Sequence, residues 1–116
     1  MNGEFLPLAE AKVGVMTHAL HYGSSVFEGI RGNWNAEQGK MYIFRPKEHY
    51  DRFLQGCKIM RINLPYTAEE LTQITVDLVN RCGYQQDIYI RPLAYNGDER
   101  VAVLKLQDLE LSLIHI

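Results

Sequence analysis

Several patterns that would identify a class of protein are absent from this sequence of 116 residues. It has only two cysteines and no apolar run long enough to cross a bilayer, so neither a disulfide-rich secreted domain nor a transmembrane helix is indicated. The first residues, MNGEFLPLAEAK, lack the charged start and the long apolar run of a signal peptide. We therefore expect a soluble, cytoplasmic protein.

Clusters of one charge sign and common catalytic motifs are also lacking. Twelve basic and fourteen acidic residues give a net charge of -2, and no basic patch suggests nucleic acid or an anionic membrane as a partner. There is no G-x-S-x-G, P-loop or G-x-G-x-x-G motif, which leaves hydrolase and nucleotide-binding functions without support. His18, His21 and His49 do not have the spacing of metal ligands, so we expect structural histidines and no metal.

The composition that remains is that of an ordinary globular protein. Apolar residues make up 47% of the chain, which is enough for one domain with a buried core. Cys57 and Cys82 fall at apolar positions of expected helices, without metal-ligand spacing. We therefore expect two buried free thiols rather than a disulfide.

Strand patterns occur in both halves of the chain. MNGEFLPL reads as a first strand with a turn at Asn2–Gly3. GIRGNW and KMYIFR flank NAEQG, a loop that ends in glycine, which is typical of a β-hairpin. In DIYIRPLAY, isoleucines alternate with Tyr89 and Arg91, which predicts a further strand, and we expect VAVLKL to be its antiparallel partner.

Two helices are predicted between these strands. The first starts at Pro46, and its apolar side chains recur at helical spacing: Tyr50, Phe53, Leu54, Cys57 and Met60. The second has a capping box formed by Thr67 and Glu70, an apolar face of Leu71, Ile74, Leu78 and Cys82, and Gly83 as its stop. The expected fold is α+β, a mostly antiparallel sheet with two helices on one face.

Tyr89 and Arg91 are the clearest functional candidates on pattern alone. Both should project from the strand face opposite the core isoleucines. A guanidinium next to a phenol forms a carboxylate receptor, although an exposed structural pair fits the pattern equally well. Arg52 stands in a run of charged residues on a helix, which by itself favours a solvated face over a phosphate site.

A resemblance changes the interpretation of these residues. HALHYGSSVFEGIR, His18 to Arg31, resembles the signature of branched-chain amino acid aminotransferases, which are fold-type IV pyridoxal-phosphate enzymes. NGEFLPLAEAKVGVMTHAL, FRPKEHYDRF and YIRPLAYNGDE resemble further segments of that family in the same order. The resemblance runs from Asn2 to about Glu110.

The resemblance implies a role for each of five residues. Arg52 would bind the phosphate of pyridoxal 5'-phosphate, since arginine stays charged at any working pH. Tyr22 and Phe27 would line the pocket for the substrate side chain, Tyr22 in the site of a neighbouring subunit. Tyr89 would bind the substrate α-carboxylate, and Arg91 would bind the side-chain carboxylate when glutamate is the amino donor.

The implied reaction is transamination between leucine, isoleucine or valine and 2-oxoglutarate, in a homodimer or higher homo-oligomer. The family's Schiff-base lysine and the glutamate that contacts the pyridine nitrogen would both follow the last residue given, so this chain alone should be inactive. D-amino acid aminotransferases and aminodeoxychorismate lyases share the fold but differ in the segment that resembles HYGSSVFEG. A non-catalytic dimerisation or binding domain is the alternative from another class.

The same resemblance divides the chain into two parts. We expect residues 1–110 to be the N-terminal small domain of such an enzyme, with Gly29 permitting a close backbone approach. LSLIHI, residues 111–116, departs from the family pattern and equals one reading frame of a transposon adapter used in sequencing libraries. We therefore expect a non-native tail there, with a genuine apolar strand as the alternative.

Overall fold

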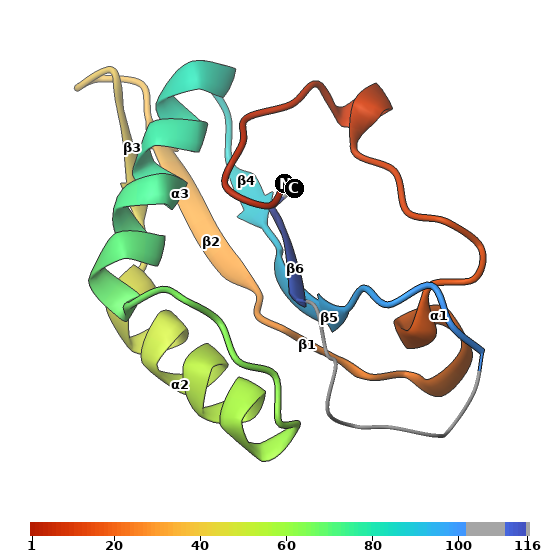
Figure 1. The fold of residues 1–116 in the computed structure, drawn as a ribbon. Helices are drawn as coiled ribbons and strands as arrows, with labels where there is room; N and C mark the ends of the chain where they lie inside the picture. Colours follow the sequence, from red (N-terminus) through yellow and green to blue (C-terminus); the bar gives the residue numbers. More distant parts are fainter. Residues whose placement is uncertain (102–110, 116) are drawn as a thin grey trace.

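The computed structural model describes residues 1–101 and the backbone of residues 111–115. The N-terminal part runs through a 3-10 helix to a short helix, three strands and two longer helices, and further strands follow (Figure 1). In chain order the elements are η1 (Leu8–Glu10), α1 (His18–Tyr22), β1 (Ser25–Phe27), β2 (Ile30–Asn35), β3 (Lys40–Ile43), α2 (Pro46–Ile59), α3 (Ala68–Cys82), β4 (Ile88–Ile90), β5 (Pro92–Asn96) and β6 (Leu111–His115).

The strands form two antiparallel sheets, in the orders β3-β2-β4 and β1-β5-β6. The β1–β5 pair and the β2–β4 pair have the same antiparallel register. Ser25 lies opposite Tyr95 in the first pair, and Ile30 lies opposite Ile90 in the second, five residues later on one chain segment and five residues earlier on the other. β1 and β2 are therefore successive parts of one bent strand, and so are β4 and β5. The β2–β3 hairpin is confirmed, with Gly39 at a positive φ of 61° in its loop.

Both long helices begin where local signals place them, and α3 also ends at its predicted stop. α2 carries Pro46 in its first turn, where the missing N–H costs no hydrogen bond. At the start of α3, the Thr67 hydroxyl accepts from the Glu70 N–H at 3.2 Å and the Glu70 carboxylate accepts from the Thr67 N–H at 2.7 Å. Gly83 ends α3 in the left-handed conformation, at φ 64°. The two predicted helices are confirmed, except that α2 ends at Ile59 and Met60, expected on its apolar face, is its exposed C-cap.

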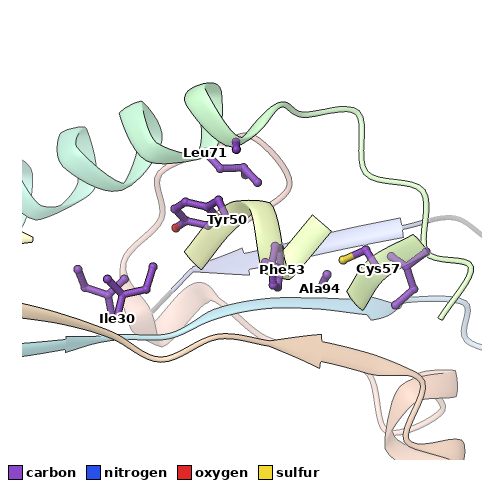
Figure 2. Packing of buried hydrophobic residues seen from close by; sticks show 9 residues of the cluster. Ile30, Tyr50, Phe53, Cys57, Leu71 and Ala94 are labelled. Atoms are coloured by element: carbon purple, nitrogen blue, oxygen red, sulfur yellow. The ribbon is translucent and has the colours of Figure 1, made fainter. Parts of the chain in front are cut away.

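The helices α2 and α3 cover one face of the sheet (Figure 1), and the core lies between this helix layer and the strands (Figure 2). In Figure 2 the side chains of α2 point toward the strands beneath it, and the hydroxyl of Tyr50 on this helix pairs with that of Thr75 on α3. The core residues are Ile30, Tyr50, Phe53, Cys57, Ile62, Ala68, Leu71, Ile90 and Ala94. This arrangement confirms the α+β fold with two helices on one face of an antiparallel sheet.

Two sequence predictions are wrong. Cys57 is buried, and burial raises the pKa of its thiol to about 11, but Cys82 is exposed. The buried residues of α3 all lie in its first eight positions, so its last turn extends past the core.

The predicted first strand is also absent. The Asn2–Gly3 turn forms, but no strand follows it. Instead, the ring of Phe5 lies beneath the Arg81 guanidinium of α3, with 4.2 Å between the ring centre and the guanidinium carbon.

Other expectations stay open. The partner strand expected at VAVLKL lies, beyond Val101, outside the described residues. Residues 111–115 form β6 against β5, but backbone pairing does not reveal the origin of a segment, so the non-native tail stays a prediction. Within the described ranges, no helix has both the length and the apolar character needed to span a membrane.

Candidate active site

The candidate site is built around an interruption in the ladder between the two bent strands. The pairing stops after Phe27, opposite Leu93, and resumes at Ile30, opposite Ile90. Glu28 and Gly29 lie in the gap, where the Glu28 N–H still donates to the Pro92 carbonyl at 3.1 Å. Pro92 is the first residue of β5, a position at which proline is tolerated in a sheet.

On the sheet face away from the helices, Phe27, Tyr89 and Arg91 form one cluster. The Arg91 guanidinium lies 4.1 Å from the centre of the Phe27 ring and 5.1 Å from that of Tyr89. Its Nη2 donates to the Tyr89 hydroxyl at 2.8 Å, while its Nε is buried and has no hydrogen-bond partner among the described residues. Both rings are more than half exposed. The predicted neighbourhood of Tyr89 and Arg91 is confirmed.

Gly29 makes this cluster possible. A Cβ at this position would collide with the hydroxyl and the ring of Tyr89. The sequence predicted a close approach at Gly29, and the approaching group is the Tyr89 side chain. A larger residue would have to displace the Tyr89 hydroxyl from Arg91.

On the opposite face, toward α2, lies an ionic cluster that the sequence analysis missed. Glu28 is only 7% exposed, and its carboxylate accepts from Arg52 Nε at 2.6 Å and from Arg52 Nη2 at 2.7 Å. His49 Nδ1 lies 2.9 Å from the second carboxylate oxygen. The Arg52 hydrogen bonds are the largest influence on the pKa of Glu28, and with His49 they lower it despite the opposing effect of burial.

A signal for Glu28 was present in the sequence. Alternation along the strand puts Val26, Glu28 and Ile30 on the same face, so a carboxylate stands between two core residues. A charge at such a position needs a partner. The identity of the partner depended on packing with α2, more than twenty positions along the chain.

Arg52 faces a hollow beside this cluster. The hollow has a volume of about 250 Å³ and is lined by Phe44, Arg45, Glu48, His49 and Arg52. The Arg52 side chain is 70% exposed. Its guanidinium has five donors, and the hydrogen bonds to Glu28 use only Nε and Nη2. The residue therefore combines a fixed position with an edge available to an anion.

Tyr22 lies apart from both clusters, at the end of α1. It is 45% exposed, and its ring contacts are with His18 and His21. His18 bonds the Ser24 hydroxyl at 2.8 Å and His21 bonds the Val15 carbonyl at 2.7 Å, so both histidines have structural roles. Within the described residues, no group of three or more His, Cys, Asp or Glu side chains is arranged to hold a metal ion.

Comparison with known proteins shows which family the chain resembles. The family model for amino-transferase class IV matches residues 25–114. A probable branched-chain-amino-acid aminotransferase of Aquifex aeolicus is 44% identical over 97 residues, which cover 84% of this chain and 31% of that protein.

Solved structures of the same enzyme type are also similar. The branched-chain aminotransferase from Thermoproteus uzoniensis with norvaline has a TM-score of 0.89 at 40% identity, over 99% of this chain and 38% of that one. The branched-chain amino acid aminotransferase from Thermobaculum terrenum in its PLP-form has a TM-score of 0.83 at 37% identity, over 97% and 36%. The chain thus spans about a third of the length of these relatives. By sequence and by fold, it belongs to the class IV aminotransferase family.

Proposed function

We propose that this chain is the N-terminal small domain of a longer branched-chain aminotransferase that depends on pyridoxal 5'-phosphate. The reaction is transfer of an amino group between leucine, isoleucine or valine and 2-oxoglutarate. The observation that carries the proposal is the cluster of Phe27, Tyr89 and Arg91, which joins an aromatic ring, a hydroxyl and a guanidinium on one face of the sheet. The names of the similar proteins support the same substrate class.

Arg52 would hold the phosphate of the cofactor. A phosphate dianion requires a permanent cation with directional donors, and the exposed edge of Arg52 in the hollow beside His49 fits that requirement. The Thermobaculum terrenum enzyme was solved in its PLP-form, which supports the choice of cofactor. When bound, the cofactor supplies an electron sink that stabilises negative charge at the substrate α-carbon.

The open cluster would bind the substrate. Phe27 offers an apolar wall to a branched side chain, and the Tyr89 hydroxyl donates to the α-carboxylate that all amino donors share. Arg91 would bind the second carboxylate of glutamate through Nη hydrogens that do not go to the Tyr89 hydroxyl, since its Nε is buried. An apolar wall with one arginine at its edge thus accepts leucine-like and glutamate-like donors in the same pocket.

The lysine that reacts with the cofactor would come from the rest of the enzyme. Lys47 is paired with Asp51 at 3.0 Å and with Glu69 at 3.3 Å, and none of the lysines that the structure describes lines the Arg52 hollow. We therefore expect no transamination by the 116-residue chain alone. The described residues would supply binding and orientation only.

Tyr22 would complete the pocket of a neighbouring subunit in a homodimer or higher homo-oligomer. It is absent from its own Phe27–Tyr89–Arg91 cluster, and the segment before it exposes apolar side chains, with Val15 80% and Leu20 62% exposed. Exposed apolar side chains in such a run favour a protein interface over solvent.

The test is expression of the enzyme from its complete source gene, followed by an assay of glutamate formation from leucine and 2-oxoglutarate. We expect leucine-dependent glutamate and none from the 116-residue chain alone. Exchange confined to D-alanine would indicate a D-amino acid aminotransferase, and pyruvate release from aminodeoxychorismate would indicate a lyase. A complete protein that dimerises but does not bind the cofactor would be a non-catalytic domain.

A further inference from the structure

Glu28 has no place in the reaction proposed above, yet it is one of the most constrained residues of the site. It is 7% exposed on the core side of the strand, and its backbone is tied to Pro92 across the ladder. A carboxylate in such a place costs stability unless it is paired and hydrogen-bonded. Its two oxygens receive the Nε and Nη2 donors of Arg52, at 2.6 and 2.7 Å, and this double contact fixes the guanidinium plane.

The geometry divides the guanidinium into two edges. The Nε–Nη2 edge is occupied by Glu28. Nη1 and the second hydrogen of Nη2 form the other edge, which is as well suited to two phosphate oxygens as the first is to two carboxylate oxygens. Because Glu28 is buried and Arg52 is 70% exposed, the carboxylate holds the arginine from the protein side and leaves the free edge toward solvent.

His49 holds Glu28 in turn. Glu28 is ionised at neutral pH because its pKa is lowered, so it can only accept, and His49 Nδ1 must carry the hydrogen that it donates across 2.9 Å. The 3.4 Å contact between Arg52 Nη2 and the same Nδ1 is then a contact between two donors and not a hydrogen bond. His49 therefore acts on Arg52 through Glu28.

We infer that Glu28, held by His49, is a positioning residue that aims Arg52 at the phosphate of the cofactor. This inference rests on the proposed function, because it requires that Arg52 bind that phosphate. Glu28 itself touches neither cofactor nor substrate. Removal of Glu28 should weaken phosphate binding only because Arg52 is then misplaced. Once Arg52 is removed, losing Glu28 as well should cause no further loss.

The experiment uses the complete enzyme freed of cofactor, and it compares the dissociation constants of pyridoxal 5'-phosphate and pyridoxal, which lacks the phosphate. Glu28→Gln should weaken binding of the phosphorylated form about tenfold and leave pyridoxal unchanged. The double variant with Arg52→Ala should be no weaker than Arg52→Ala alone. Asp51→Asn is the matched control, because Asp51 makes an exposed ion pair with Lys47 on the same helix, and it should change neither constant.

A second pair of variants tests the inference if Glu28→Gln does not fold. His49→Asn keeps a donor near the Nδ1 position and should bind normally, whereas His49→Leu should weaken only the phosphorylated form, by about threefold. Equal losses for both ligands, or losses from Glu28→Gln and Arg52→Ala that multiply, would overturn the inference. If Arg52→Ala itself left both constants unchanged, the proposed role of Arg52 would be wrong.

Discussion

Phe27 and Glu28 are neighbours in the chain, but their exposures are the reverse of what their side chains favour. The phenylalanine is 56% exposed on the open face, and the glutamate is 7% exposed on the face toward the helices. One residue earlier and two residues later the pattern is ordinary, since Val26 packs against the core and Ile30 is fully buried. The inversion is confined to the last paired residue of β1 and the first residue of the gap that follows it.

The contrast shows that at this point each face of the strand contacts a different arginine. Exposing Phe27 and burying Glu28 both cost stability. Each residue then contacts an arginine: Phe27 lies under Arg91 on the open face, and Glu28 holds Arg52 on the other. In the proposed function, Arg91 on the open face would bind substrate carboxylates and Arg52 of α2, on the other side, would bind the cofactor phosphate.

The largest effect should come from the core beneath the site. Phe53→Ala removes a fully buried ring, so the free energy of unfolding of the complete enzyme should fall by about 3–5 kcal/mol in urea denaturation. Phe27→Ala removes a ring of the same kind that is mostly exposed, and it should cost about 1 kcal/mol. Equal losses would mean that Phe27 is a core residue of the complete enzyme.

Arg91→Ala should separate the two amino donors. Only glutamate brings a second carboxylate, so its kcat/KM should fall about tenfold to a hundredfold while that of leucine changes much less. Arg81→Ala is the matched control, because Arg81 stacks over Phe5 at 4.2 Å, away from the site. Steady-state kinetics with both donors measure this, and equal losses would contradict the side-chain-carboxylate role.

Tyr89→Phe should have a smaller and less selective effect. The variant keeps the ring over Gly29 but loses the hydroxyl that Arg91 contacts, so glutamate and leucine should both lose roughly twofold to tenfold in kcat/KM. Tyr42→Phe, at an exposed tyrosine of the hairpin, should change neither. A loss for one donor only would move the α-carboxylate away from Tyr89.

The smallest effect concerns acid stability. The pKa of Glu28 is lowered from 4.5 in the folded protein, so its stabilising contribution is present above about pH 4.5 and is lost as the pH falls through the folded value. The unfolding free energies of the natural protein and of Glu28→Gln should therefore converge on acidification. Urea midpoints between about pH 6 and pH 3 measure this, and a gap that stays constant would show that Glu28 is not charged in the fold.

Local signals were enough to predict much of this fold. The start of α2 at Pro46, the caps of α3 at Thr67 and Gly83 and the β2–β3 hairpin depend on neighbouring residues, and all of them formed as predicted. The alternation that placed Tyr89 and Arg91 together also depends only on local geometry.

Long-range packing accounts for what the sequence did not predict. The pairing of β1 and β2 with β5 and β4 joins residues about seventy positions apart near Ser25. The partners of Glu28 are 21 and 24 positions away. Cys82 fits the helical period of α3 but lies beyond the part of the helix that the sheet covers. None of these outcomes is encoded in a short window of sequence.

The central claim is that Arg52, on the helix side of the sheet, binds the cofactor phosphate and that Arg91, on the open face, binds the substrate. The most direct test is a spectrophotometric titration of the cofactor-free complete enzyme with pyridoxal 5'-phosphate, for the natural protein, Arg52→Ala and Arg91→Ala. Arg52→Ala should bind the cofactor about tenfold to a hundredfold more weakly, and Arg91→Ala should stay within about twofold of the natural protein. Unchanged binding by Arg52→Ala, or equal weakening in both variants, would contradict the account.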